Sequence, residues 1–170
     1  MKDATPQEHK AHAPASVGCF VLTVSDSKTP DTDTSGALIR ELLTAAGHRV
    51  AGHAIVRDEP AQVTAVIRSG CAAPSVEVFI LTGGTGITKR DSTFEAVEAM
   101  LDKRLTGFGE LFRMLSYQEI GPAAMLSRAQ GGVVQGRVLF SLPGSPNACR
   151  LALESLIIPE LGHLIREVNR

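Results

Sequence analysis

Residues 76–93 read VEVFILTGGTGITKRDST, and this stretch decides the fold. The run 76–81 is mostly apolar and predicts a strand. It leads directly into a loop that contains the three closely spaced glycines Gly83, Gly84 and Gly86. Because glycine accepts positive φ and has no Cβ, such a loop lets a phosphate approach the backbone N–H groups.

A helix is predicted to follow the loop. Ser92 stands three residues before Glu95, which predicts a capping box at the start of a helix over 94–101. The loop also carries a base and an acid, Arg90 and Asp91. A carboxylate at a phosphate site indicates Mg²⁺ and chemistry rather than anion storage. The spacing fits neither the Walker A motif nor G-x-G-x-x-G, so a turn that binds nothing stays an alternative.

Composition limits the class of protein. The chain has 170 residues, 44% hydrophobic and 21% charged, which is typical of one globular domain over 16–170 behind a flexible tail over 1–15. A net charge of -1 and 4% aromatic residues argue against nucleic-acid or membrane partners. The polar N-terminus and the lack of an apolar run near membrane-spanning length favour the cytoplasm.

The three cysteines are widely spaced and form no C-x-x-C pair, which predicts neither a zinc site nor a disulfide framework. Cys19 and Cys149 lie in apolar runs and are expected to be buried small hydrophobic residues. The sequence leaves the environment of Cys71 open.

The first half of the chain alternates strands and helices. Residues 17–25 and 48–56 predict strands, a helix is expected over 35–46, and Pro60 suits the first turn of another helix. With the strand over 76–81, this order predicts a parallel sheet with right-handed crossovers.

Polar residues follow the ends of these strands. Ser25 and Asp26 lie at the end of the first predicted strand, Asp58 follows the second, and the glycine loop follows the third. Ligands of parallel sheets bind beyond the carboxyl ends of the strands, so these groups are expected to meet at one rim. Taken alone, Asp26 and Asp58 could simply cap turns or helices.

The second half is less regular. Residues 107–116 place apolar side chains on one helical face, and 127–134 with 137–142 predict a hairpin that turns at Gln135-Gly136. Ser145 and Pro146 suit the N-cap and first turn of a last helix, whose apolar face is expected to be core. This junction could hold a second anion or be an ordinary capped helix.

Taken in order, these motifs resemble the MoaB/MogA family of molybdenum-cofactor biosynthesis proteins. The resemblance covers nearly everything after the tail, and 107–121 resembles the MoaB branch in particular. The matching segments are 23–26 (TVSD), 31–36 (DTDTSG), 56–59 (VRDE), 82–86 (TGGTG), 90–93 (RDST), 107–113 (GFGELFR) and 142–146 (LPGSP).

The resemblance implies a three-layer α/β/α molybdopterin-binding fold with a mostly parallel sheet and a small β-hairpin. It implies homo-oligomers, trimers or hexamers, and contact with other molybdenum-cofactor enzymes. It also implies adenylyl transfer, in which ATP and molybdopterin give adenylyl-molybdopterin and pyrophosphate with Mg²⁺.

The resemblance further implies residue roles. Asp58 and Asp91 match the family's acidic active-site positions and would hold Mg²⁺ and orient the substrates. Backbone amides of the glycine loop would bind phosphate, and Gly144 with Ser145 would hold the pterin end. The remaining substrate contacts implied are Ser25, Asp26, Thr82, Gly83, Gly84, Thr85, Gly86, Arg90, Glu110, Ser127 and Pro143.

Several alternatives stay open. Arg90 either neutralises triphosphate charge or pairs with an acid. Glu110 with Arg113 either forms a surface ion pair or faces the ligand across a subunit boundary. Phe94 stands where relatives often have proline, a helix-start residue. Some MoaB-type relatives keep the fold without adenylyl transfer but tend to lack the Arg90-Asp91 pair. A binding protein without turnover is therefore the alternative function, and a different nucleotide hydrolase, as in competence-damage-type relatives, is a third.

Overall fold

The computed structural model describes residues 13–88 and 91–170. Six strands of these residues form one sheet in the order β2-β1-β3-β6-β5-β4. The first four in that order run parallel, and β5 pairs antiparallel with both β6 and β4. The strands are β1 (Gly18–Val24), β2 (Arg49–Val56), β3 (Val78–Thr82), β4 (Lys103–Arg104), β5 (Gln130–Val134) and β6 (Arg137–Leu142).

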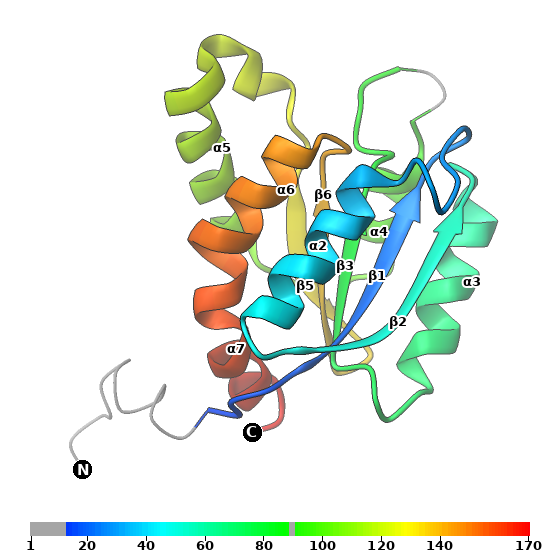
Figure 1. The fold of residues 1–170 in the computed structure, drawn as a ribbon, viewed down its shortest axis with the longest axis vertical. Coiled ribbons are helices and arrows are strands. Elements are labelled where there is room, and N and C mark those ends of the chain that lie inside the picture. Colours follow the sequence, from blue (N-terminus) through cyan, green and yellow to red (C-terminus); the bar gives the residue numbers. More distant parts are fainter. Residues whose placement is uncertain (1–12, 89–90) are drawn as a thin grey trace.

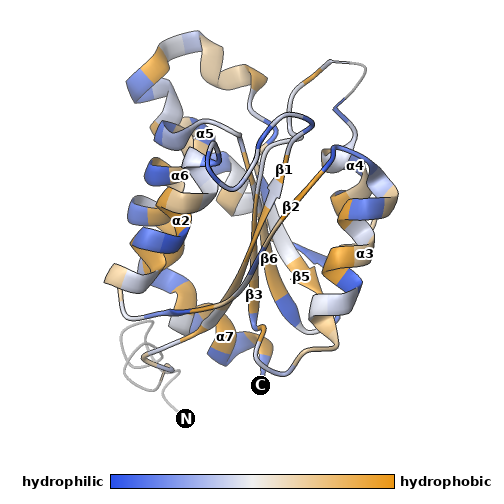
Figure 2. Ribbon diagram, turned by 45° about the vertical axis from the view of Figure 1, so that its right-hand side comes forward, coloured by the Kyte–Doolittle hydropathy of each residue, from blue (hydrophilic) through white to orange (hydrophobic). Residues whose placement is uncertain are grey.

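Helices cover both faces of this sheet, with α3 and α4 on one face and α2, α5, α6 and α7 on the other (Figures 1 and 2). The α-helices are α2 (Thr34–Ala45), α3 (Pro60–Cys71), α4 (Thr93–Glu98), α5 (Thr106–Ile120), α6 (Pro146–Ala152) and α7 (Leu161–Val168). Short helical turns occur at η1 (Gly121–Leu126), η2 (Leu153–Ile157) and η3 (Ile158–Glu160). This architecture confirms the predicted three-layer α/β/α fold.

Each face of the sheet packs its own hydrophobic cluster. All five residues of β3 are buried because helices cover it on both sides. Ile80 packs in one cluster with Ile39 of α2, and Phe79 packs in the other with Ile67 of α3. Burial of each such side chain contributes roughly 1.5–3 kcal/mol. The two clusters together hold the sheet, and so the strand ends, in place.

The predicted hairpin is confirmed. Its two turn residues, Gln135 and Gly136, both have positive φ, at 47° and 73°. Such angles at both central positions match the twist of the flanking strands.

Ahead of β1, Ala13 and Pro14 lie against Gly162 of α7. None of the helices in the described ranges is both long and apolar enough to cross a membrane.

Two predictions around α4 are wrong. The helix ends at Glu98 rather than at residue 101, and the chain then forms the two-residue strand β4, which the sequence did not predict. The capping box does not form either, because Ser92 makes no side-chain hydrogen bond as N-cap. The Ser92 hydroxyl instead donates to Asp58 Oδ1 at 3.4 Å, a partner 34 residues away that the local pattern cannot reveal.

The three cysteines are free thiols. Cys19 and Cys149 are buried as predicted, and burial raises their pKa values to about 12 and about 11. Cys71 is half-buried at the end of α3, and burial also raises the pKa of its thiol. A thiol reacts only if it can form the thiolate and if the reagent can reach it. Cys71 is the one of the three that is not fully buried, so it is the one that a reagent can reach.

We therefore expect a disulfide reagent to modify Cys71 alone in the native protein, and all three thiols after denaturation. Colorimetric thiol titration with and without guanidinium chloride measures both numbers. The Cys71→Ala variant should lose the native-state reaction entirely. Rapid reaction of native Cys71→Ala would show that Cys19 or Cys149 is accessible, contrary to this structure.

Candidate functional site

The four parallel strands end in register at the upper edge of the sheet in Figure 1. Val24 of β1 pairs with Val56 of β2, and Thr23 pairs with Thr82 of β3. Thr82 in turn pairs with Leu142 of β6. The loops after all four strands therefore leave from one rim, which confirms the predicted convergence of the polar segments.

The loops after β3 and β6 are bonded to each other. The buried Thr82 hydroxyl donates to the Pro143 carbonyl at 3.0 Å. The Ser35 hydroxyl of α2 donates to the Gly144 carbonyl at 2.7 Å. A Cβ added at Gly144 would lie 3.5 Å from the Cα of Gly83, so the two backbones run in contact. These bonds fix the loops that the resemblance assigns to the phosphates and the pterin.

The glycine loop depends on positive φ, at 97° for Gly83 and 66° for Gly84. A Cβ at Gly83 would collide with the Val24 carbonyl, so a side chain cannot be placed there. The Gly83 amide donates to the Leu142 carbonyl at 3.0 Å, which corrects its expected role as a phosphate donor. The amides of Gly84 and Gly86 make no hydrogen bond with the described residues.

Asp58 lies at the end of β2 with only 8% of its surface exposed. Its Oδ1 accepts a 2.8 Å hydrogen bond from the Thr93 hydroxyl and longer ones from the amide and hydroxyl of Ser92. A Cβ at Gly84 would lie 3.1 Å from its Oδ2. The carboxylate therefore lies against the glycine loop and also anchors the start of α4.

Asp91 lies in the segment that joins the glycine loop to α4. Its Oδ2 accepts hydrogen bonds from the Thr88 hydroxyl at 2.6 Å and from the Thr88 amide at 2.9 Å. A Cβ at Gly86 would lie 2.5 Å from this oxygen. The two carboxylates thus flank the glycine loop, whereas Arg90, the other charged residue predicted there, lies outside the described residues.

These carboxylates fit a magnesium site of the kind that substrate completes. Each has an oxygen, Oδ2 of Asp58 and Oδ1 of Asp91, that accepts no hydrogen bond from the described part of the chain. No group of three His, Cys, Asp or Glu side chains in that part is placed to hold a metal ion. Mg²⁺ commonly uses one or two carboxylates, with substrate phosphates and water as its other ligands.

The other predicted contacts at the rim have local structural roles. The Ser25 hydroxyl accepts from the amides of Ser27 and Lys28 and closes the turn that also holds the exposed Asp26. The Ser145 hydroxyl accepts from the Ala148 amide at 3.2 Å, as the predicted N-cap of α6. The ordinary capped helix is therefore present, and a ligand role for Ser25, Asp26 and Ser145 stays a prediction.

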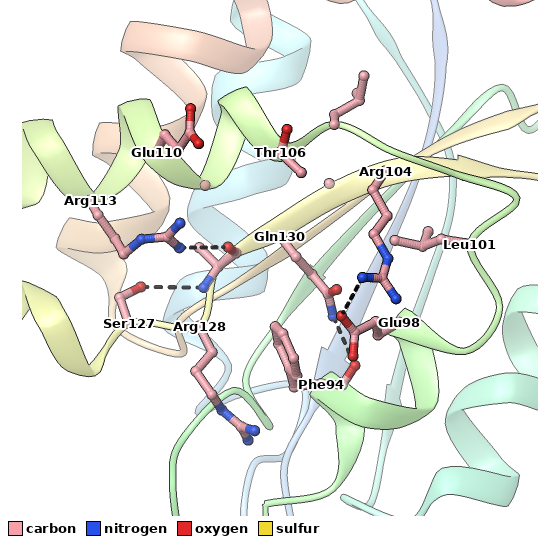
Figure 3. Close-up of a pocket in the computed structure, with 14 residues that line it drawn as sticks. Phe94, Glu98, Leu101, Arg104, Thr106, Glu110, Arg113, Ser127, Arg128 and Gln130 are labelled. Atoms are coloured by element: carbon pink, nitrogen blue, oxygen red, sulfur yellow. Dashed lines mark hydrogen bonds and ion pairs between the residues drawn. The ribbon is translucent and has the colours of Figure 1, made fainter.

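A cavity of about 390 Å³ lies beside the rim, between α4, α5 and the start of β5 (Figure 3). Two predicted contacts, Glu110 and Ser127, line it, while Asp58, Asp91 and Ser145 do not. Arg113 also lines it and donates to the Ala129 carbonyl at 3.3 Å, so the surface ion pair considered for Glu110 and Arg113 does not form between these described residues.

Arg128 connects this cavity to the glycine loop, and the sequence did not identify it. Its Nε donates to the Thr85 carbonyl at 3.1 Å, and its Nη2 donates to the Gly86 carbonyl. Its Nη1 pairs with Glu95, and this hydrogen bond is the main cause that lowers the pKa of the Glu95 carboxyl. The Phe94 ring lies 4.6 Å beneath the guanidinium carbon.

Comparison with known proteins now identifies the family. Residues 20–163 match the family model described as "Probable molybdopterin binding domain". The chain belongs to this family of molybdenum-cofactor biosynthesis proteins. It is 52% identical over 164 residues to molybdenum cofactor biosynthesis protein B of Bacillus cereus, a match that covers 96% of this chain and 97% of that protein.

Solved structures of the family share the fold. A crystal structure of a molybdenum cofactor biosynthesis protein B superposes with a TM-score of 0.90 at 52% identity, and covers 94% of this chain and 99% of that one. The tungsten cofactor synthesizing protein MoaB from Pyrococcus furiosus gives a TM-score of 0.81 at 40% identity, with 93% and 100% covered. The predicted resemblance to the MoaB/MogA family is therefore confirmed.

The bond from Thr82 to Pro143 can be tested by Thr82→Val, which keeps the side-chain shape and removes the hydroxyl. We expect a loss of about 1–3 kcal/mol in the free energy of unfolding, because the hydroxyl of the buried Thr82 and its bond to the Pro143 carbonyl are removed. Urea denaturation at fixed protein concentration measures this loss. Thr44→Val, at an exposed hydroxyl that bonds only its own helix, is the control and should cost less than about 0.5 kcal/mol. Equal effects at the two sites would contradict this role for Thr82.

Proposed function

We propose that this protein is a cytoplasmic molybdopterin adenylyltransferase. In this reaction the terminal phosphate oxygen of molybdopterin attacks the α-phosphorus of ATP. A new phosphorus–oxygen bond forms, the bond to the β-phosphate bridging oxygen breaks, and pyrophosphate leaves. The observation that carries the proposal is that the carboxylates of Asp58 and Asp91 flank a glycine loop in which the Gly84 and Gly86 amides make no hydrogen bond with the described residues.

In this reaction the protein mainly has to position the two substrates and to neutralise the negative charge of the reacting phosphates. Phosphoryl-type transfer needs little covalent help, and preorganised donors and cations supply most of the rate effect. The amides of Gly84 and Gly86 would bind phosphate oxygens, and the carboxylates of Asp58 and Asp91 would hold Mg²⁺. When bound, this ion neutralises the negative charge of the triphosphate.

The remaining contacts are assigned by their place around this centre. Gly144 and Ser145 would hold the pterin end, and Glu110 with Ser127 would contact whichever substrate part extends into the cavity. The other proposed contacts lie at the rim or in the glycine loop: Ser25, Asp26, Thr82, Thr85, Arg90 and Pro143.

The alternative is a member of the family that binds molybdopterin or nucleotide without turnover. Both carboxylates also accept hydrogen bonds that hold the local backbone in place. Asp58 accepts from Thr93 at the start of α4, and Asp91 accepts from Thr88. Such bonds would persist in a protein that only binds. Turnover is therefore the property that separates the two functions.

We expect pyrophosphate release that requires ATP, Mg²⁺ and molybdopterin together. Asp58→Asn and Asp91→Asn should each lower the rate about 100-fold or more, because each removes charge that faces the reacting phosphates. Glu41→Gln, an exposed carboxylate on α2, is the charge-matched control and should keep the wild-type rate. An enzyme-coupled pyrophosphate assay measures the release.

Each other outcome points elsewhere. Binding of molybdopterin or ATP without pyrophosphate release would indicate the non-catalytic alternative. Pyrophosphate or phosphate release from ATP alone would indicate a different nucleotide hydrolase. Full activity in both carboxylate variants would remove the basis of this proposal.

We also propose that the protein is a homo-oligomer, as the resemblance implies. α5 and η1 expose an apolar surface, which we call the α5–η1 surface: Leu111, Met114, Tyr117, Ile120, Met125 and Leu126, each 48–79% exposed. Large apolar side chains gathered in this way on a soluble protein are typical of an interaction site. The occupant we propose is a second copy of this chain.

Light scattering coupled to size exclusion should give a multiple of the 18.0 kDa chain mass for the wild type. The double variant Met114→Glu and Tyr117→Glu should move toward the monomer, because it places charge in the apolar contact. Gln118→Glu adds charge at an exposed polar position of the same helix and should leave the assembly intact. A monomeric wild type at micromolar concentration would exclude a stable assembly.

A further inference from the structure

We propose that Arg128 is a positioning residue that sets which way the peptide groups of the glycine loop point. Its guanidinium bonds two successive carbonyls of the loop, those of Thr85 and Gly86. In a trans peptide unit the carbonyl and the following N–H point in opposite directions. The Gly86 and Ile87 amides are therefore directed away from Arg128.

This orientation decides whether the loop attracts or repels an anion. With the carbonyls tied to Arg128, the opposite side of the loop presents N–H groups, which is the arrangement that binds phosphate. If either peptide rotated, a carbonyl oxygen would face the phosphate instead. Because glycine accepts many backbone angles, Gly86 by itself does not prevent this rotation.

Arg128 is held in place from several sides. Figure 3 shows its side chain directed away from α5, on the Phe94 side of the cavity. The ring of Phe94 lies against the guanidinium face, and Glu95 bonds its Nη1. A planar guanidinium suits this combination, since it stacks on an aromatic face while its N–H groups donate in the plane.

Phe94 gains a role in this arrangement. It stands where relatives of the family often have proline, and a proline ring offers no π face to a cation. The Phe94 ring lies against the face of the guanidinium. Its three nitrogens each donate one hydrogen bond, to Glu95 and to the two loop carbonyls. Two of these three hydrogen bonds go to the glycine loop, so the orientation of Arg128 is set together with that of the loop.

The identity of the ligand rests on the proposed function, so the test has one arm with ligand and one without. In the first arm, isothermal titration measures the affinity for Mg²⁺–ATP and for inorganic pyrophosphate. Arg128→Gln should weaken both about 10-fold or more, because misdirected amides no longer converge on the phosphates. Arg128→Lys keeps the charge but cannot bond both carbonyls in one plane, and should also lose most of the affinity.

Arg104→Gln is the control for charge alone. Arg104 lines the same cavity and pairs with Glu98 at 3.3 Å rather than with the loop. Its loss should weaken binding clearly less than the loss of Arg128. Equal effects of Arg104→Gln and Arg128→Gln, with Arg128→Lys like the wild type, would mean that only charge matters and would overturn the proposal.

The second arm needs no ligand. Crystal structures of the wild type and Arg128→Lys should differ in the two peptides after Thr85 and Gly86, which we expect to be rotated or spread over several orientations in the variant. Asp58, which Arg128 does not touch, should keep its place. An unchanged loop would overturn the positioning role, whatever the affinities are.

The two arms separate this inference from the proposed function. The wild type could bind neither ATP nor pyrophosphate while the loop still changes in Arg128→Lys. This result would contradict the proposed adenylyltransferase function and support the positioning role of Arg128. A variant that merely folds less well would have a lower melting temperature. Its folded fraction would still bind with the wild-type affinity.

Discussion

In-register pairing of four parallel strands is the constraint on which the site depends. Because β2, β1, β3 and β6 end at the same level, the four loops that follow them must share one rim. Hydrogen bonds join these segments to one another: Gly83 to Leu142, Thr82 to Pro143, and Ser35 at the start of α2 to Gly144. The rim is consequently a bonded unit rather than a set of independent loops.

Side chains from distant parts of the chain complete this unit. Asp58 bonds Thr93 and so joins the end of β2 to the start of α4. Arg128, just before β5, bonds the glycine loop from the opposite direction. Asp91 bonds Thr88 within the loop itself. A change at any of these residues is therefore expected to alter loop geometry as well as charge, which is why matched controls are needed to separate the two.

The sequence predicted those features that local pattern encodes. The hairpin follows from two strand-like runs separated by Gln135 and Gly136, the start of α6 from Ser145 and Pro146, and the parallel order from alternating strands and helices. Its failures concern long-range polar pairing. Ser92 bonds Asp58 instead of capping its helix, and the carbonyl partners of Arg128 lie 42 and 43 residues away. The strand β4, two exposed basic residues, has no periodicity to detect.

Helix α5 links the cavity to the α5–η1 surface. Phe108 and Phe112 bury one side of the helix in the core, while Glu110 and Arg113 line the cavity on another side. Met114 follows Arg113 directly and points to the exposed apolar surface, since successive helical residues are separated by about 100°. A second copy packed on that surface would restrain the same helix that forms the cavity wall. Association and the shape of the cavity would then be coupled through this one helix.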